Sequence, residues 1–419
     1  MAVTKQGVMK LGHLHYGWVM VIIGACVLAA FATTVFTFGV FLLPLTIEFN
    51  WDRGALSGAY SMFLLVSGFV GIFSGRLSDR YGPRPLLTIT GIFIGIGFLL
   101  MSQVSSLWQV YIIYGLIMAV GTGSCYVPIT STIPRWFARK RGIAVGVTVA
   151  GAGLGGMISP TFTQWLISSY GWQQTYIILG LVTFIIIIPL AQSMKHSPQR
   201  IGLRPYGDDG TVEAKQSPVS IAGGLLFTHA IKTIRFWVYG LLLFWSLFAT
   251  MAILVHIAPY AVDIGISAMV AAGLLSIISG CSVIGRLTIG FIADRIEARR
   301  TLAACLFVIT LALIWILFAR EIWMFYVFAV VFGVAYGGII SLQPLIPAEL
   351  FGLSSLGIIY GSLDLLSTTG AAVGPLLAGS IFDVTESYRS AFLIFVVTGT
   401  LAVILSLILL RVRDWRADD

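Results

Sequence analysis

One arginine stands inside an apolar stretch of the chain, where a charge is unexpected. Residues 280–295 read GCSVIGRLTIGFIADR, and Arg286 has no charged neighbour before Asp294. A cation near the centre of a bilayer costs about 2.5–3.5 kcal/mol. The positions four, seven and ten residues before Arg286 are all serine, and at helical spacing they share its face, Ser282 being the nearest. A guanidinium on such a face can hold a planar carboxylate through two parallel hydrogen bonds. The alternative is that a fixed acid pairs with Arg286 and pins two helices together.

Asp364 is the only acid inside a long apolar stretch. It lies ten residues beyond Ser354, about 15 Å along a helix, and Arg286 lies about 12 Å along its own helix from Asp294. The two charges are therefore expected at comparable depth, and intramembrane acids often serve as proton relays. We hypothesise that Asp364 is ionised against Arg286 in the empty protein and takes a proton when an anion displaces it. The alternative is a polar contact that holds two helices together.

Three further side chains offer hydrogen bonds within apolar stretches. His256 lies seven residues before Asp263 and shares a face with Tyr260. It predicts either a titratable group at an outer opening or a packed hydrogen-bonding histidine. Tyr126 and Tyr336 each predict either a hydroxyl that binds a substrate oxygen or a core side chain whose hydroxyl is satisfied.

The composition places these residues in a membrane protein. The chain has 419 residues, of which 58% are hydrophobic and 10% charged, and about 20 apolar residues suffice to cross a bilayer as a helix. Twelve such stretches run over 16–46, 54–74, 86–104, 107–133, 142–168, 173–193, 236–262, 268–292, 301–319, 322–347, 355–381 and 390–410. We expect an all-α membrane protein with no cleaved signal peptide and four free cysteines.

The charge distribution predicts the orientation. The formal net charge is +8, and with twelve spans most of the Lys and Arg residues fall on the side of the two termini. Three, Arg53, Arg320 and Arg389, fall on the other side, where acids outnumber them. This asymmetry is typical of cytoplasmic termini and explains the charge without a nucleic-acid partner.

The sequence also repeats itself at an offset of 215 residues. Pro44 matches Pro259, and Gly155 and Pro160 match Gly370 and Pro375, with no gap from the first into the fifth span. We therefore predict two pseudo-symmetric six-helix bundles related by an axis along the membrane normal. The expected domains are 1–193, a cytoplasmic linker over 194–235, and 236–419.

One motif occurs in both halves, as GRLSDRYGPRP at 75–85 and GFIADRIEARR at 290–300. It resembles the signature of the major facilitator superfamily. The acids of such a motif can pair with basic side chains or helix ends and hold one side closed; the alternative is a static charged loop. The gating candidates are Asp79, Arg80, Arg84, Asp294, Arg295 and Arg299. The second copy has Ile296 and Glu297 in place of the tyrosine and glycine of the first, which predicts a different turn.

A second motif narrows the resemblance. Residues 136–160 read WFARKRGIAVGVTVAGAGLGGMISP, with small residues suited to close helix packing. The stretch resembles helix 5 of the monocarboxylate transporters and their bacterial relatives, which include oxalate–formate antiporters. The resemblance implies that Arg286 binds a substrate carboxylate and that Tyr126 and Tyr336, on helices 4 and 10, face the central cavity. Animal relatives carry a helix-1 lysine where Phe36 stands and an aspartate where Ser282 stands, so their proton mechanism does not transfer.

These observations favour a secondary transporter. Apart from Arg286 the spans hold no cation, and Ser367 stands where oxalate carriers have a lysine. A single intramembrane cation favours a substrate with one carboxylate, such as lactate or pyruvate. We expect it to be moved with a proton by alternating access. The alternatives are an organic-anion exchanger of the oxalate–formate type and a carrier or sensor for another small anion. No nucleophile–base motif or metal-ligand spacing occurs in the sequence, so we expect no enzyme, cofactor or metal. We expect a monomer in the cell inner membrane.

Overall fold

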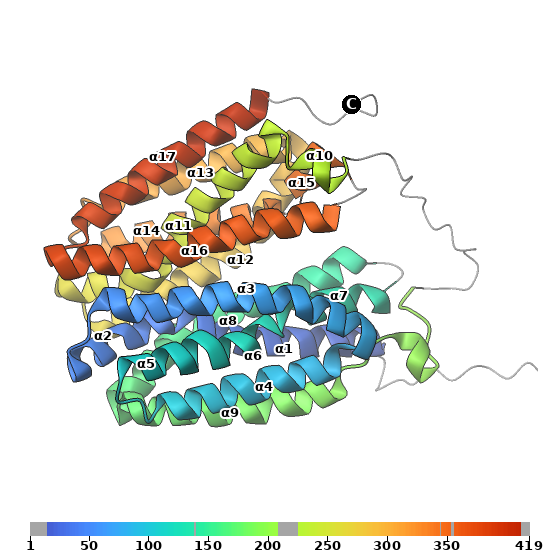
Figure 1. Ribbon diagram of the computed structural model, residues 1–419, viewed down its shortest axis with the longest axis horizontal. Helices are drawn as coiled ribbons and strands as arrows, with labels where there is room; N and C mark the ends of the chain where they lie inside the picture. The colour runs from blue at the N-terminus through green and yellow to red at the C-terminus, as the bar shows by residue number, and fades with distance from the viewer. Residues whose placement is uncertain (1–14, 138–139, 208–224, 344, 353–355, 412–419) are drawn as a thin grey trace, which may run out of the picture.

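The computed structural model describes residues 15–137, 140–207, 225–343, 345–352 and 356–411, and these residues form helices joined by short turns (Figure 1). The first half contains α1 Tyr16–Phe36, α2 Phe38–Phe49, α3 Arg53–Tyr81, α4 Pro83–Met101, α5 Leu107–Val110, the π-helical η1 Tyr111–Met118, α6 Ala119–Gly123, α7 Tyr126–Thr132, the 3₁₀ turn η2 Ile133–Trp136, α8 Arg141–Tyr170 and α9 Trp172–Ser193. The linker carries η3 Pro198–Ile201 and α10 Phe227–Ala230. The second half contains α11 Ile234–Asp263, α12 Ala268–Ile296, α13 Ala298–Ile316, α14 Ile322–Leu342, α15 Leu345–Phe351, α16 Leu356–Thr385 and α17 Arg389–Arg411.

These helices make twelve segments long and apolar enough to cross a membrane, from Tyr16–Phe49 to Arg389–Arg411. The predicted count is therefore confirmed, and the chain is a multi-pass membrane protein. Several spans are interrupted: α1 passes into α2 at Thr37, and the fourth span changes from α5 through η1 and α6 to α7. Such breaks are found where neighbouring helices or polar groups satisfy the freed backbone groups.

The duplication is visible in the helix bounds and in the packing. The bounds of α12, α13 and α16 lie 215 residues beyond those of α3, α4 and α8. A Cβ added to Gly155 of α8 would lie 2.2 Å from the Ala29 carbonyl oxygen of α1. One added to Gly370 of α16 would lie 2.2 Å from the Phe244 carbonyl oxygen of α11. The two contacts are equivalent, since Ala29 and Phe244 are also 215 residues apart. In both, only glycine lets the two backbones approach so closely.

The small residues of α8 allow close packing against two neighbouring helices, α1 and α12. Gly151 and Gly155 face the backbone of α1, whereas Gly153 and Gly156 face Val283 and Ser279 of α12. Gly146 has open space where a Cβ would be. The helix-5 motif thus holds α8 against its own half on one face and against the other half on the second face.

The turn between α12 and α13 differs from expectation. In the first half Gly82 makes the turn at φ 86°, and Glu297 occupies the equivalent position at φ 114°. The backbone therefore remains in the positive-φ region, although a non-glycine residue there costs about 1–3 kcal/mol. The Glu297 carboxylate forms an ion pair with Arg300, whose Nε atom lies 2.9 Å from Oε2, and this pair helps to hold the turn.

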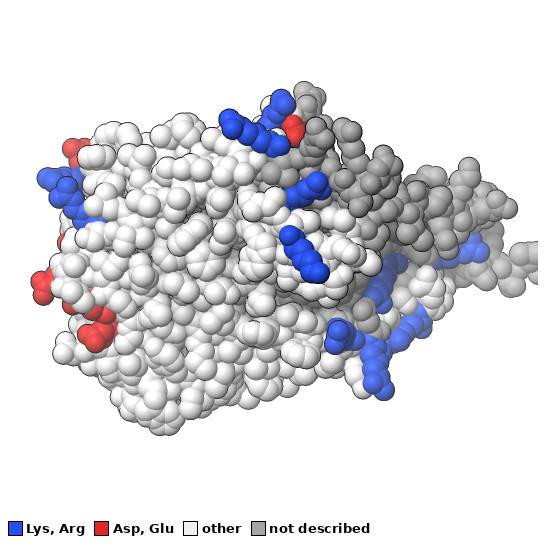
Figure 2. All heavy atoms as spheres, turned by 45° about the horizontal axis from the view of Figure 1, so that its top comes forward, with Lys and Arg blue, Asp and Glu red and all other residues white. Residues whose placement is uncertain are grey.

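The two halves meet along three pairs of helices, α3 with α16, α8 with α12 and α2 with α11. We call the end that carries residues 194–206 and α10 the linker end, and the opposite end the loop end. Basic side chains gather at the linker end, and most acids visible in Figure 2 lie at the loop end. The loop end holds Glu48, Asp52, Asp263, Glu321, Asp383 and Glu386 with Arg53, Arg320 and Arg389.

A matched pair of glycine substitutions tests this packing. We expect Gly155→Ala to lower the Tm of the purified protein by about 5 °C or more, because the new Cβ would collide with the backbone of α1. Gly146→Ala on the same helix meets open space and gains about 0.5–1 kcal/mol of helix propensity. Thermal unfolding in detergent compares the two variants, and equal Tm values would contradict the close approach of α1 and α8.

Candidate functional site

Arg286 is placed by the tight packing of α12 on α14. A Cβ added to Gly285 would lie 2.1 Å from the Val334 carbonyl oxygen, and one added to Gly337 would lie 2.0 Å from that of Ser282. These contacts fix the rotation of α12 at the residue before Arg286. The Arg286 Nε atom is buried and has no hydrogen-bond partner among the described atoms. A buried guanidinium nitrogen left unpaired is costly, so this side chain is poised to receive an acceptor.

Two tyrosines from opposite halves lie close enough to Arg286 to interact with it electrostatically. Tyr126 is the first residue of α7, directly after the break in the fourth span, and its side chain is 42% exposed. Tyr336 lies on α14 and is 6% exposed. The structure thus brings together Arg286, Tyr126 and Tyr336, the three residues that the family resemblance implied for the central cavity.

Asp364 belongs to the same group of side chains. It lies on α16, is exposed, and interacts electrostatically with Tyr126 and with Tyr360. Its carboxylate accepts a hydrogen bond from Ser367 Oγ at 3.4 Å. Among the described side chains no ion pair joins Asp364 to Arg286. The ion pair expected for the empty protein is therefore absent in this conformation, and Tyr126 is the group within range of both charges.

Tyr360 is a member of this cluster that the sequence analysis did not identify. It precedes Asp364 by four residues and therefore shares its helical face. That spacing is the signal in the sequence that could have found it. We call Arg286, Asp364, Tyr126, Tyr336 and Tyr360 the central cluster.

The serines before Arg286 do not form a common polar wall with it. Ser276 exchanges a hydrogen bond with Thr161 of α8 at 2.8 Å, and Ser279 donates to the Gly153 carbonyl of α8 at 3.1 Å. Ser282 is fully buried and donates to the Ser279 carbonyl on its own helix at 2.7 Å. Ser276 and Ser279 therefore pack against the other half, whereas Ser282 is satisfied within α12.

His256 lies away from the central cluster, at the loop end of α11, and is fully buried. Its Nε2 atom lies 2.9 Å from the Pro375 carbonyl oxygen of α16 and 3.3 Å from Ser57 Oγ of α3. Its Nδ1 atom lies 3.0 Å from Tyr388 Oη. These contacts are those of the packed hydrogen-bonding histidine, one of the two alternatives that the sequence left open.

The loop end is closed by a second group that the sequence analysis missed. Arg53 donates to both carboxylate oxygens of Asp263, at 2.6 and 2.8 Å, and to Tyr388 Oη at 3.0 Å. The Asp383 carboxylate accepts the backbone N–H groups of Arg53 and Gly54 at the start of α3, where helix dipoles favour an anion. We call Arg53, Asp263, Asp383 and Tyr388 the loop-end gate, because it joins the two halves.

The gating candidates of the repeated motif bond within their own halves. Arg84 Nε donates to Gln192 Oε1 of α9 at 2.6 Å, and Arg80 lies over the ring of Tyr81. Arg299 is 3.7 Å from Glu297 and 3.8 Å from Glu349 of α15. The side chains of Asp79, Asp294 and Arg295 lie outside the described part of the structure. Their pairing therefore stays a prediction.

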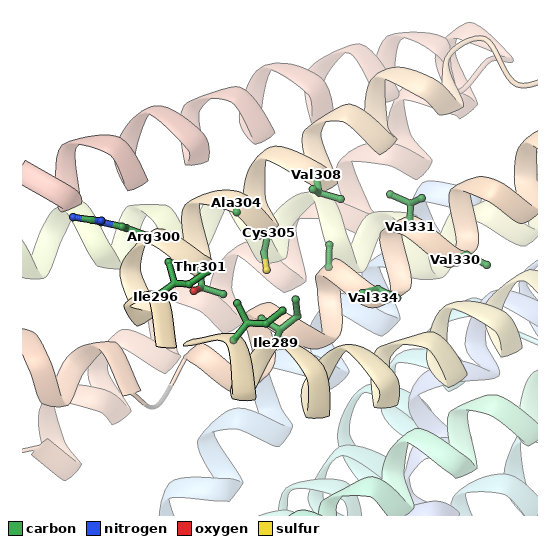
Figure 3. Close-up of a pocket in the computed structure, with 12 residues that line it drawn as sticks. Ile289, Ile296, Arg300, Thr301, Ala304, Cys305, Val308, Val330, Val331 and Val334 are labelled. Atoms are coloured by element: carbon green, nitrogen blue, oxygen red, sulfur yellow. The ribbon is translucent and has the colours of Figure 1, made fainter. Parts of the chain in front are cut away.

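An apolar cavity of about 490 Å³ lies apart from the central cluster, between α12, α13 and α14 (Figure 3). Its walls are mainly Ile, Val and Ala side chains, with Thr301 and Arg300 at one end. Such a lining suits hydrocarbon and not a small anion. Over the described residues no group of His, Cys, Asp and Glu is arranged to hold a metal ion.

The sequence is similar to a family of known proteins and to several of its members. The sequence model of the Major Facilitator Superfamily matches residues 22–296 and 263–417. The chain is 23% identical to Monocarboxylate transporter 12 of Homo sapiens over 90% of this chain and 78% of that protein. It is 26% identical to the uncharacterized MFS-type transporter YcxA of Bacillus subtilis (strain 168) over 89% of this chain and 90% of that protein.

Among solved structures the fold is similar to that of a bacterial homologue of the human lysosomal transporter Spinster. That structure is in an inward-facing and occupied conformation, and the TM-score is 0.77 at 15% identity, over 97% of this chain and 100% of that one.

Proposed function

Because the chain belongs to the Major Facilitator Superfamily and is a membrane transporter of that type, we propose that it carries a small monocarboxylate, such as lactate or pyruvate, together with a proton. The two halves rock about the central cluster and expose it alternately to each side. The observation that carries the proposal is the buried, unpartnered Nε of Arg286 beside tyrosine hydroxyls from both halves.

The proposed substrate site uses three residues. Arg286 binds the carboxylate through two parallel hydrogen bonds, and the hydroxyls of Tyr126 and Tyr336 bind its oxygens or the neighbouring hydroxyl or keto group. Tyr126 comes from the first half and the other two from the second, so a bound anion would bridge the halves. Ser282 and His256 lie outside this proposal, because both are fully buried and hydrogen-bonded elsewhere.

In this proposal Asp364 carries the proton. Its exposed carboxylate and Arg286 both interact electrostatically with Tyr126, which supports a site shared by the anion and the proton. An anion on Arg286 favours the protonated form of Asp364, because two negative charges in a medium of low dielectric repel each other. One proton would therefore accompany one monoanion.

The proposal also assigns the conformation. The loop-end gate joins the halves, whereas α7 packs on α3, α4 and α8 and α15 packs on α13, α14 and α16, each within its own half. This supports a state that is closed at the loop end and open at the linker end. The excess of basic side chains at the linker end supports a cytoplasmic position for that end, and we infer an inward-open state of a monomer in the inner membrane with cytoplasmic termini.

In the outward-open state the linker end would be closed, and we propose that the repeated motifs then act as the gate, with Asp79 and Asp294 pairing to basic side chains or helix ends. The two bodies that move are the halves bounded by residues 193 and 236.

Uptake of labelled L-lactate into proteoliposomes tests the function. We expect the initial rate to rise several-fold when the outside is more acidic than the inside, since a proton moves inward with each anion. If uptake ignores the pH gradient but rises with internal unlabelled anion, the protein is an exchanger, as in the alternative of the oxalate–formate type. If neither lactate, pyruvate nor another monocarboxylate is taken up, the substrate proposal is wrong.

A further inference from the structure

The loop-end gate continues inward through one hydrogen-bonded chain to His256. Arg53 of α3 donates to Tyr388 Oη at 3.0 Å, and Tyr388 Oη lies 3.0 Å from His256 Nδ1. His256 Nε2 then lies 2.9 Å from the Pro375 carbonyl oxygen of α16. Arg53 belongs to the first half and the other three residues to the second, so the chain crosses the interface between the halves.

The partners fix the proton positions along this chain. A carbonyl oxygen only accepts, so His256 Nε2 carries the hydrogen that points to Pro375. A guanidinium only donates, so Tyr388 Oη accepts from Arg53 and its own hydrogen is free to point to Nδ1. This arrangement suits a neutral imidazole whose Nδ1 lone pair accepts from the Tyr388 hydroxyl.

A second proton on His256 does not fit this arrangement. With an Nδ1–H, Tyr388 Oη would have to accept two hydrogen bonds, one from Arg53 and one from His256, and the Tyr388 hydrogen would lose its acceptor on Nδ1. The same proton adds a cation to a fully buried group that interacts electrostatically with Arg53. A buried cation needs an oppositely charged partner, and the hydrogen-bonded path from Arg53 to Pro375 offers none at the imidazole.

The surrounding charges do not remove that conflict. The charged and titratable groups on the elements packed around His256 are Arg53 from α3, Asp263 and Tyr260 from α11, Asp383 from α16 and Tyr388 before α17. The Asp263 carboxylate takes both terminal nitrogens of Arg53, and the Asp383 carboxylate takes two backbone N–H groups. Both acids are thus engaged in the gate itself.

We propose that His256 is a positioning residue for the transport cycle, and that protonating its Nδ1 atom opens the loop-end gate. The closed gate favours neutral imidazole, because the ring is fully buried and Nδ1 faces the Tyr388 hydroxyl, whereas an open gate admits water to the ring and stabilises the cation. Acid therefore shifts the population towards the state open at the loop end. This inference rests on the proposed alternating access, but not on which anion is carried, and it separates His256 from the proton carried on Asp364.

The experiment measures the separation of the halves at the loop end without any substrate. Spin labels are placed at Gln103 and Glu386, two exposed positions on opposite halves, after the four native cysteines are replaced by alanine. Distances are measured by double electron–electron resonance in nanodiscs between about pH 5 and pH 8, the range in which histidine changes charge. We expect the ratio of separated to closed molecules to rise on acidification, by up to about tenfold per pH unit for one proton.

Variants isolate the histidine. His256→Gln keeps an N–H donor for the Pro375 carbonyl but does not titrate, so we expect a closed gate at every pH. Arg53→Gln removes the charged link, so the separated population should dominate at every pH. His229→Gln, at an exposed histidine of α10, is the matched control and should respond like the wild type.

Two outcomes would overturn the proposal. One is a wild-type distance distribution that does not change with pH, and the other is a His256→Gln variant that keeps the wild-type pH response. Neither outcome bears on lactate uptake, so a failure here is distinguishable from a failure of the proposed function. A His256→Gln variant that does not fold is recognised by its size-exclusion profile, and His256→Asn, which keeps an acceptor for Tyr388, then replaces it.

Discussion

Replacing Arg286 by lysine is expected to lower the initial rate of lactate uptake by about 30-fold or more. The lysine keeps the positive charge but presents a single ammonium group, which cannot form the two parallel hydrogen bonds of a guanidinium to a carboxylate. Losing a hydrogen bond to a charged group costs about 1.5–3 kcal/mol, and each 1.4 kcal/mol is a factor of about ten. The packing of α12 on α14 places the side chain through Gly285 and Gly337, so it is not expected to change.

The measurement is uptake at several lactate concentrations in proteoliposomes, alongside Arg389→Lys. Arg389 is an exposed residue at the loop end, and its replacement should leave the rate unchanged. We expect Arg286→Ala to be as inactive as Arg286→Lys, with thermal stability close to that of the wild type because Arg286 Nε has no hydrogen-bond partner among the described residues. A lysine variant that retains more than about half of the rate would show that Arg286 contributes charge alone, or that the anion binds elsewhere.

The twelve spans and the duplication were predictable because each depends on local chemistry that the sequence states directly. A bilayer demands about 20 apolar residues per helix, and the chain supplies them twelve times. The repeat was predictable to the residue, since Gly155 and Gly370 occupy equivalent contacts with Ala29 and Phe244. A close backbone approach allows only glycine, so the constraint appears as a residue type at a fixed spacing.

The loop-end gate was not predictable, because it is assembled from residues far apart in the chain. Arg53 meets Asp383 across 330 positions and Asp263 across 210. The sequence showed Arg53 as one of three basic residues on an acidic side, which is a signal for a paired charge but names no partner. Which pairs form depends on the rotation of one half against the other, and that rotation is not a local property.

The serine positions before Arg286 show a second limit. Helical periodicity gave their common face correctly, but the face of a helix does not identify what covers it. Ser276 and Ser279 satisfy their hydroxyls on α8 of the other half. The same ambiguity hid the electrostatic interaction of Tyr126 with both Arg286 and Asp364, because three helices must be positioned before these side chains come into range.

Asp364→Asn is expected to abolish the ability of a proton gradient to accumulate lactate. With one proton per anion, a gradient of one pH unit allows an accumulation of about tenfold, since each 1.4 kcal/mol is a factor of about ten. Asparagine resembles the protonated acid in shape and charge but cannot release a proton, so the variant should equilibrate lactate to a ratio of about one. Exchange of labelled for unlabelled lactate should persist, because Arg286 and its tyrosines are untouched.

A pH-sensitive dye inside the proteoliposomes measures the protons that enter with each lactate, and Asp52→Asn provides the matched control. Asp52 is exposed at the loop end and makes no side-chain cap bond to α3, so its variant should keep one proton per lactate. An Asp364→Asn variant with that same ratio would exclude Asp364 as the proton carrier. Loss of exchange together with coupling would instead indicate that Asp364 holds helices in place, the alternative that its position in the sequence left open. Persistence of exchange without coupling is the result that assigns the proton to this carboxylate, because packing alone cannot separate the two activities.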